Sequence, residues 1–97
     1  MLPLYSELGN TFLQLERYKP AEIAFKNAIK INPDFVNAHY GLAGAYLKQN
    51  LSNEALIEFQ KVIELAPDSQ EAKYAQNILQ QIAQEKLKAP PTETDNP

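Results

Sequence analysis

The sequence predicts an all-α fold, a short α-solenoid of antiparallel helix pairs. Three observations support this class: the chain repeats itself after 34 residues, apolar side chains recur at helical spacing in each copy, and Pro-Asp closes both copies. Self-similarity at a period of roughly 20 to 50 residues is typical of stacked helical repeats. The matched pairs are Leu8 and Leu42, Phe12 and Tyr46, Leu13 and Leu47, Ala21 and Ala55, Ile23 and Ile57, Phe25 and Phe59, and Ile29 and Ile63.

The first copy, residues 2–35, is predicted to form two helices joined by a tight turn. Apolar residues of its first half recur at intervals of three and four, at Tyr5, Leu8, Phe12 and Leu15. After an interruption at residues 16–19, the same spacing resumes. Pro20 fits the first turn of the second helix, where no backbone donor is needed, and Pro33 lies where that helix must end.

The second copy, residues 36–69, follows the same plan. Asn50 can adopt the left-handed conformation that ends a helix, and Ser52 or Asn53 can cap the next one. Small residues stand at matched positions, Gly9 with Ala43 and Ala21 with Ala55. We expect them to let the helix axes approach closely, with Leu8 and Leu42 as core residues beside them.

Residues 70–88 continue helically but form a cap, not a third repeat. Positions where a following repeat would pack are polar, at Lys73, Gln76, Asn77 and Gln80. Another face is apolar and suited to packing on the second copy, with Ala72, Ala75, Leu79, Ile82 and Ala83. A polar-faced terminal helix is what a stacked array needs for solubility. Residues 89–97 contain proline, acid and amide residues with nothing large and apolar, so we expect a disordered tail.

Taken together, these residues resemble the tetratricopeptide repeat signature. The residues that carry the resemblance are Tyr5, Leu8, Gly9, Phe12, Ala21, Phe25, Ala28 and Pro33, then His39, Leu42, Ala43, Tyr46, Ala55, Phe59, Val62 and Pro67. Three positions depart from the usual pattern: His39 replaces a bulky residue, Val62 a small one, and Glu16 a common turn glycine. The resemblance implies a right-handed solenoid of two repeats, 2–35 and 36–69, and a capping helix.

The resemblance also implies a concave groove lined by the first helix of each pair. The groove residues it indicates are Ser6, Asn10, Leu13, Gln14, Asn37, Tyr40, Leu47, Lys48, Tyr74 and Ile78. Amide side chains offer both donors and acceptors to an extended peptide backbone, and tyrosines add large rigid contacts. We therefore expect a non-enzymatic module that binds a peptide or a partner protein. The alternative is that Tyr40 and Tyr74 are ordinary surface residues.

The N-terminal end suggests a second function. Leu4 and Leu15 occupy positions that face backward along the stack, where no preceding repeat covers them. Either the chain belongs to a longer array, or a second copy covers this face in a homodimer. A third reading is that both leucines are merely half-exposed surface residues.

Composition and charge argue against most other functions. The chain has 97 residues, no cysteine, a single histidine and a net charge of −3. No thiolate metal site, nucleotide-binding glycine loop or basic nucleic-acid stripe can be assembled, so we expect no cofactor, no metal and no nucleic acid partner. No apolar stretch could span a membrane, and no signal peptide is recognisable. The sequence thus favours a cytoplasmic protein that is not an enzyme.

Two polar features of the sequence resemble sites but favour structural roles. His39 occupies a position of the repeat that packs between helices, so a packing role is favoured over a site role. The carboxylates of Glu54 and Glu58 lie at helical spacing on the outward helix, where a solvated charged face is the usual meaning.

Overall fold

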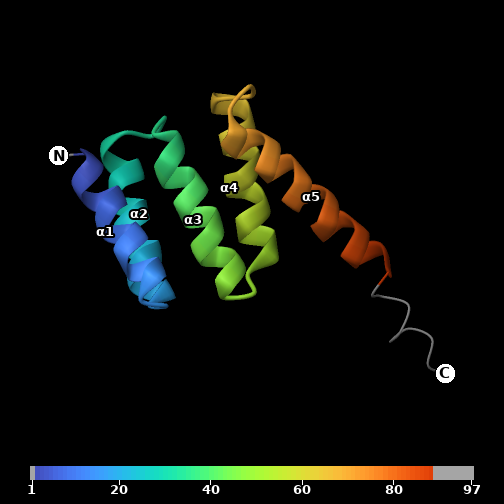
Figure 1. Ribbon diagram of the computed structural model, residues 1–97, viewed down its shortest axis with the longest axis horizontal. Helices are drawn as coiled ribbons and strands as arrows, with labels where there is room; N and C mark the ends of the chain where they lie inside the picture. The colour runs from blue at the N-terminus through green and yellow to red at the C-terminus, as the bar shows by residue number, and fades with distance from the viewer. Residues whose placement is uncertain (1, 89–97) are drawn as a thin grey trace.

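A computed structural model describes residues 2–88, with side chains from residue 4 to residue 85. This part of the chain forms five α-helices in sequence, and no strand (Figure 1). The helices are α1 (Leu2–Gln14), α2 (Tyr18–Ile31), α3 (Val36–Lys48), α4 (Ser52–Leu65) and α5 (Gln70–Lys88). The predicted all-α class is confirmed, and the predicted disordered tail, residues 89–97, lies outside the described residues.

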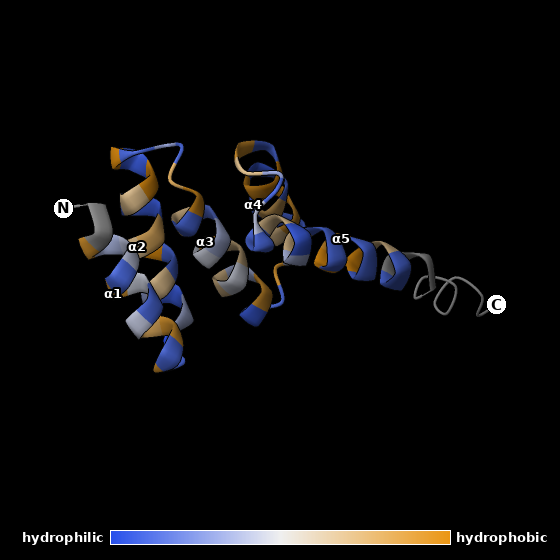
Figure 2. Ribbon diagram, turned by 45° about the horizontal axis from the view of Figure 1, so that its top comes forward, coloured by the Kyte–Doolittle hydropathy of each residue, from blue (hydrophilic) through white to orange (hydrophobic). Residues whose placement is uncertain are grey.

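The helices stack in chain order. Each packs mainly against the helix before it and the helix after it, and α1 also contacts α3. Figure 1 shows α1 to α4 side by side, with α5 crossing α4 and slanting away from the stack. Hydrophobic and hydrophilic residues alternate along α5 (Figure 2). This arrangement brings α1, α3 and α5, the first helices of successive units, to one side of the molecule.

The core of the first pair is built around Phe25 of α2, which is completely buried. A Cβ atom added at Gly9 of α1 would lie 2.7 Å from two carbons of the Phe25 ring, and one added at Gly41 of α3 would also collide with that ring. The ring is therefore held between two glycines from two different helices. Gly9 was expected at a close helix contact, but the matching role of Gly41 was missed.

The two tight turns within the pairs have the same geometry. Glu16 and Asn50, which are one repeat apart, have positive φ angles of 61° and 64°. After each, the backbone N–H bonds back across the turn, from Arg17 to Phe12 at 2.8 Å and from Leu51 to Tyr46 at 2.9 Å. This is the Schellman pattern that satisfies carbonyls at a helix end. The prediction for Asn50 is confirmed.

The start of α4 differs from expectation. Leu51 occupies the N-cap position of α4, so the predicted capping by Ser52 or Asn53 is wrong. Both residues already belong to the helix, because the left-handed residue Asn50 turns the chain within a single step.

Helix α5 divides into two faces as predicted, with one exception. Ala72, Ala75 and Ile82 are buried, whereas the polar residues Lys73, Gln76, Asn77 and Gln80 are exposed. Ala83, predicted to pack inward, is exposed. The outer face of α5 therefore meets solvent with amide and lysine side chains.

Candidate functional site

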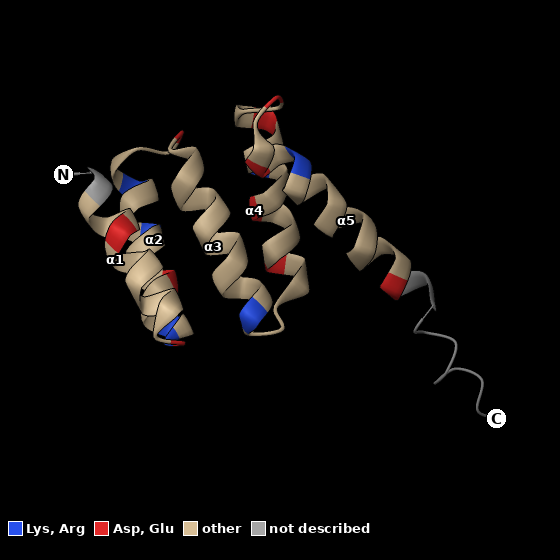
Figure 3. Cartoon of the chain, viewed as in Figure 1, with Lys and Arg blue, Asp and Glu red and all other residues tan. Residues whose placement is uncertain are grey.

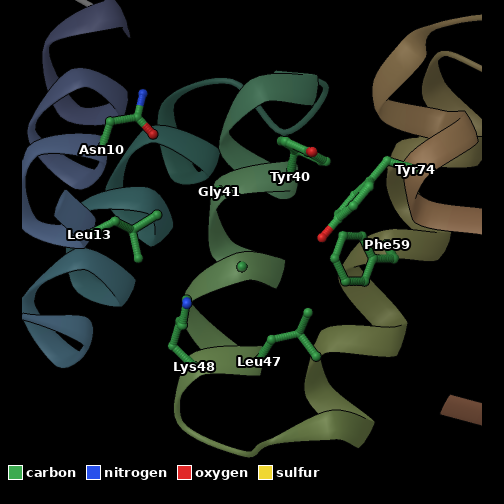
Figure 4. A pocket seen from close by; sticks show the side chains of 9 residues that line it. Asn10, Leu13, Tyr40, Gly41, Leu47, Lys48, Phe59 and Tyr74 are labelled. Atoms are coloured by element: carbon green, nitrogen blue, oxygen red, sulfur yellow. The ribbon is translucent and has the colours of Figure 1, made fainter. Parts of the chain in front are cut away.

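A cavity of about 240 Å³ lies over α3, between α1 and α5 (Figure 4). Its lining residues are Asn10 and Leu13 of α1, Tyr40, Gly41, Gly44, Leu47 and Lys48 of α3, Phe59 of α4 and Tyr74 of α5. In Figure 4 the hydroxyl end of Tyr74 points toward the middle of the pocket. We call this cavity the α3 cavity.

A second cavity, of about 520 Å³, adjoins the first. Its lining residues are Ser6, Glu7, Asn10, Phe35, Asn37, Tyr40 and Gly41. Because Asn10, Tyr40 and Gly41 line both cavities, the two form one continuous depression, which we call the groove.

The structure brings together eight of the ten residues that the sequence placed in the groove. These are Ser6, Asn10, Leu13, Asn37, Tyr40, Leu47, Lys48 and Tyr74. Ser6 is only 6% exposed, so little of its side chain reaches the groove surface. Gln14 and Ile78 line neither cavity: Gln14 lies at the exposed end of α1, and Ile78 packs against the core as α5 slants away from α3.

The sequence reasoning missed several lining residues. Gly44 lies four residues after Tyr40 and three before Leu47, so the helical spacing of the predicted residues could have found it. Phe59 had no such signal, since it occupies a core position of the second helix and is almost fully buried. Phe35, Glu7 and Gly41 complete the groove lining.

Three aromatic rings form one wall of the α3 cavity. Tyr40, Phe59 and Tyr74 meet edge to face, with ring centroids 5.9 to 6.4 Å apart. This is the preferred geometry for aromatic pairs. Burial raises the pKa of Tyr40, and the neighbouring Tyr74 and Glu71 add to the rise. The wall is thus an aromatic surface, and the raised pKa of Tyr40 keeps its hydroxyl uncharged at neutral pH.

Gly44 forms part of the cavity floor and has no packing role of its own. Its φ angle is not positive, and a Cβ atom added there would meet nothing within 4 Å. Glycine inside a helix costs roughly 0.5–1 kcal/mol relative to alanine. No packing contact requires a glycine at position 44. At position 41 a glycine is required, because its hydrogen faces the Phe25 ring.

Charge in the groove is sparse. Lys48 is exposed at one end of the α3 cavity, and Glu7 lines the other end of the groove. Among Lys, Arg, Asp and Glu, α3 contains Lys48 alone, as Figure 3 shows. The groove therefore offers amide, aromatic and aliphatic surface with one cation at its edge.

His39 lies outside the groove and is buried between α3 and α4. Its Nδ1 is 2.7 Å from Oε1 of Glu58, and its Nε2 is 2.6 Å from the carbonyl oxygen of Pro33. The carboxylate of Glu58 and the carbonyl of Pro33 both accept hydrogen bonds, so the protonated imidazole, in which both ring nitrogens donate, satisfies both contacts. The hydrogen bond to Glu58 is the main cause of a raised His39 pKa. The interpretation of Glu58 as a solvated surface charge is wrong, since its carboxylate is tied to His39.

The described residues contain no cluster of three or more His, Cys, Asp or Glu side chains that could hold a metal ion. None of the helices α1 to α5 is long and apolar enough to cross a membrane.

The N-terminal face of the stack is apolar and exposed. Leu4 and Leu15 are 62% and 60% exposed, and Leu8, expected in the core, is 42% exposed. One repeat later, Leu4 corresponds to Ala38, Leu8 to Leu42 and Leu15 to Gln49. Ala38 and Leu42 are buried. We call Leu4, Leu8 and Leu15 the leucine stripe. An apolar cavity of about 490 Å³ lies next to it, and of these three leucines only Leu8 lines the cavity. Its lining residues are Tyr5, Leu8, Phe12, Lys19, Pro20, Ile23, Ala24 and Asn27.

Helix pairs that repeat every 34 residues and share one groove define a helical-repeat protein. Such proteins stack units that contact only their neighbours, and the concave side of the stack is the surface they use for binding.

The comparisons with known proteins identify the family. The tetratricopeptide repeat family matches residues 12–82, which is most of the chain. The chain therefore belongs to the tetratricopeptide repeat family, as the sequence predicted.

Two relatives are similar over two thirds of the chain or more. Anaphase-promoting complex subunit 3 of Schizosaccharomyces pombe is 32% identical over 65 residues, which is 67% of this chain and 10% of that protein. The protein ycf37 of Cyanophora paradoxa, described as uncharacterized, is 32% identical over 79 residues, 81% of this chain and 46% of that protein. The chain thus spans less than half the length of either relative.

Proposed function

We propose that this chain is a non-enzymatic module that binds a peptide or a partner protein in the groove. One observation carries the proposal: exposed and half-buried amide, aromatic and aliphatic side chains of α1, α3 and α5 line one continuous depression. Membership of the tetratricopeptide repeat family supports it, because proteins of this family generally mediate protein–protein interactions. The name of one relative states that it is a subunit of a complex.

The groove chemistry suits an extended protein segment. An extended backbone presents N–H and C=O groups on both sides, and the carboxamides of Asn10 and Asn37 can donate and accept. The rings of Tyr40 and Tyr74 are already fixed against each other, so little side-chain entropy is lost when a ligand covers them. We propose the cytoplasm as the location of this function.

The test is affinity capture of a partner from the source lysate, followed by measurement with the purified partner. The groove variant Asn10→Ala with Lys48→Ala removes two exposed polar groups of the groove. Loss of two intermolecular hydrogen bonds, at about 0.5–1.5 kcal/mol each, should weaken binding by roughly tenfold. Isothermal titration calorimetry with the purified partner measures the change.

The matched control is Asn77→Ala with Lys73→Ala, which removes the same two groups from the outer face of α5. This control should bind the partner as well as the unchanged protein does. Equal affinity of all three proteins would refute the groove as the binding surface.

The exposed N-terminal face favours a second function, assembly with another chain. The stripe of Leu4, Leu8 and Leu15 together with Ile23 leaves four large apolar side chains exposed. We propose, as the alternative, that this face stacks with a second copy or with a further repeat.

A further inference from the structure

The floor of the α3 cavity contains a residue that the fold does not need. Gly44 lies in the interior of α3, has ordinary helical geometry, and has open space where a side chain would stand. Any other helix-forming residue would stabilise α3 more, yet it would project into the cavity. The corresponding residues of α1 and α5, Asn10 and Ile78, both carry side chains. What the glycine preserves is the cavity itself.

The size and lining of this cavity fit one side chain. A cavity of about 150 Å³ holds a benzene molecule, and the α3 cavity has a volume of about 240 Å³. Leu13 and Leu47 provide aliphatic surface, and the ring wall of Tyr40, Phe59 and Tyr74 provides aromatic surface. One leucine, methionine or phenylalanine side chain would fill it.

The charge at the edge of the cavity indicates what should lie beside that side chain. Lys48 lines the cavity, is exposed, and forms no ion pair with the part of the chain that the structure describes. Glu7 lines the opposite end of the groove. A carboxylate next to the inserted side chain would therefore be attracted by Lys48 and kept from the Glu7 end.

We propose that the α3 cavity is an anchor pocket that receives one bulky apolar side chain of an extended peptide, flanked by an acidic residue that pairs with Lys48. This inference rests on the proposed peptide-binding function of the groove and names the feature of the ligand that is recognised.

The direct test uses a defined probe, the tripeptide N-acetyl-Asp-Leu-Asp-amide, which presents a carboxylate on either side of the leucine. Its binding is followed by amide chemical shifts in ¹H–¹⁵N NMR spectra at millimolar concentrations. We expect shifts centred on the amides of Gly44, Leu47 and Lys48. Replacing leucine by glycine in the probe should weaken binding at least tenfold, and replacing both carboxylates by amides should weaken it a few-fold.

The variant Gly44→Leu fills the pocket from within and should abolish these shifts. Gly44→Ala reduces the pocket by one methyl group, so it should weaken probe binding a few-fold while raising the melting temperature. If Gly44→Leu fails to fold, the effect of Gly44→Ala on probe binding tests the anchor pocket. Gln60→Leu, on the exposed side of α4, is the matched control and should leave probe binding unchanged. Unchanged probe binding by Gly44→Leu, or equal binding of the glycine probe, would overturn the proposal.

The captured partner separates this inference from the proposed function. If Asn10→Ala with Lys48→Ala weakens partner binding but Gly44→Leu does not, the groove binds the partner and the anchor pocket is refuted. If neither change weakens binding, the groove proposal itself fails.

Discussion

His39 shows how a single side chain ties two units together. When protonated, its imidazole donates one hydrogen bond to Glu58 on α4 and one to the carbonyl of Pro33, in the turn that joins α2 to α3. Phe35 and Asn37, which line the groove, lie two and four residues after Pro33. The protonated imidazole therefore stabilises the segment that forms one end of the groove.

The raised pKa of His39 predicts that stability falls as the pH rises. A folded-state pKa above the unfolded value of about 6.5 gives a stabilisation that is complete below pH 6.5 and is lost as the pH rises through the folded pKa. Each unit by which the pKa is raised corresponds to about 1.4 kcal/mol. Thermal unfolding followed by circular dichroism between about pH 6 and 9 should show a decreasing melting temperature.

The charged groups around His39 define the control. Glu58 raises its pKa, whereas burial and the ammonium group of Lys61 lower it. Glu58→Gln should therefore flatten the pH dependence over this range. A melting temperature that is constant or increases across the range in the unchanged protein would contradict a protonated His39.

The packing position of His39 follows from the 34-residue repeat, but its partners do not. Glu58 is 19 residues away, and whether its carboxylate turns inward depends on the space left beside the imidazole. The same position in the first repeat holds Tyr5, which has no imidazole nitrogen to attract a charge. Repeat alignment therefore shows where a side chain packs, not which polar partner it selects.

At the scale of one element, α3 contains two glycines with opposite roles. Gly41 is required because its hydrogen faces the Phe25 ring, and that ring cannot retreat without striking Gly9 on the other side. Gly44, one turn later, faces empty space. A single helix thus carries one glycine for packing and one that keeps a cavity open.

This contrast makes a matched pair of substitutions informative. Gly41→Ala should destabilise the protein by about 1–3 kcal/mol, since a methyl group would be forced into a closely packed core. Gly44→Ala should stabilise it by roughly 0.5–1 kcal/mol, the difference in helix propensity. Urea unfolding of both variants measures the two effects, and equal effects of the same sign would contradict these assignments.

The limits of the helices were predicted well where local chemistry decides them. Asn50 ends α3, and Pro33 follows the end of α2. Pro20 lies in the first turn of α2, as predicted, although the helix begins at Tyr18, inside the interruption of the apolar spacing at residues 16–19. The left-handed residue Glu16 alone reverses the chain, so a helix can resume two residues later.

At the scale of the whole molecule, the two ends of the stack differ in polarity. The outer face of α5 is covered by exposed amide and lysine side chains, while the stripe on α1 exposes Leu4, Leu8 and Leu15. The sequence predicted this difference from Leu4 and Leu15. It did not predict the adjacent cavity, since that depends on how Ile23 and Pro20 of α2 lie beside α1.

If the N-terminal face mediates assembly, its charge should control the oligomeric state. Leu4→Glu with Leu15→Glu places two carboxylates on this face, and burial of each leucine contributes about 1.5–3 kcal/mol. Sedimentation velocity should then report monomers for the variant and a larger species for the unchanged protein. The control, Ile57→Glu with Leu65→Glu on α4, should form the same larger species as the unchanged protein. If the larger species persists in the α1 variant, the N-terminal face does not mediate assembly.

The fold was more predictable than the site for a physical reason. The fold depends on periodic apolar residues, which the sequence displays twice, whereas the α3 cavity depends on where side chains are missing. Gly44 could be placed in the floor from its helical spacing to Tyr40 and Leu47, but the wall at Phe59 depends on the distances between helices, which no single stretch of sequence encodes.

The position of Phe25 also bears on what counts as a module of this protein. The 34-residue period places a boundary between residues 35 and 36, but the Phe25 ring of the first repeat is completed by Gly41 of the second. The unit that packs around Phe25 is therefore three helices long, from α1 to α3. A repeat moved into another array would have to bring with it the first helix of its successor, or a glycine in the same place.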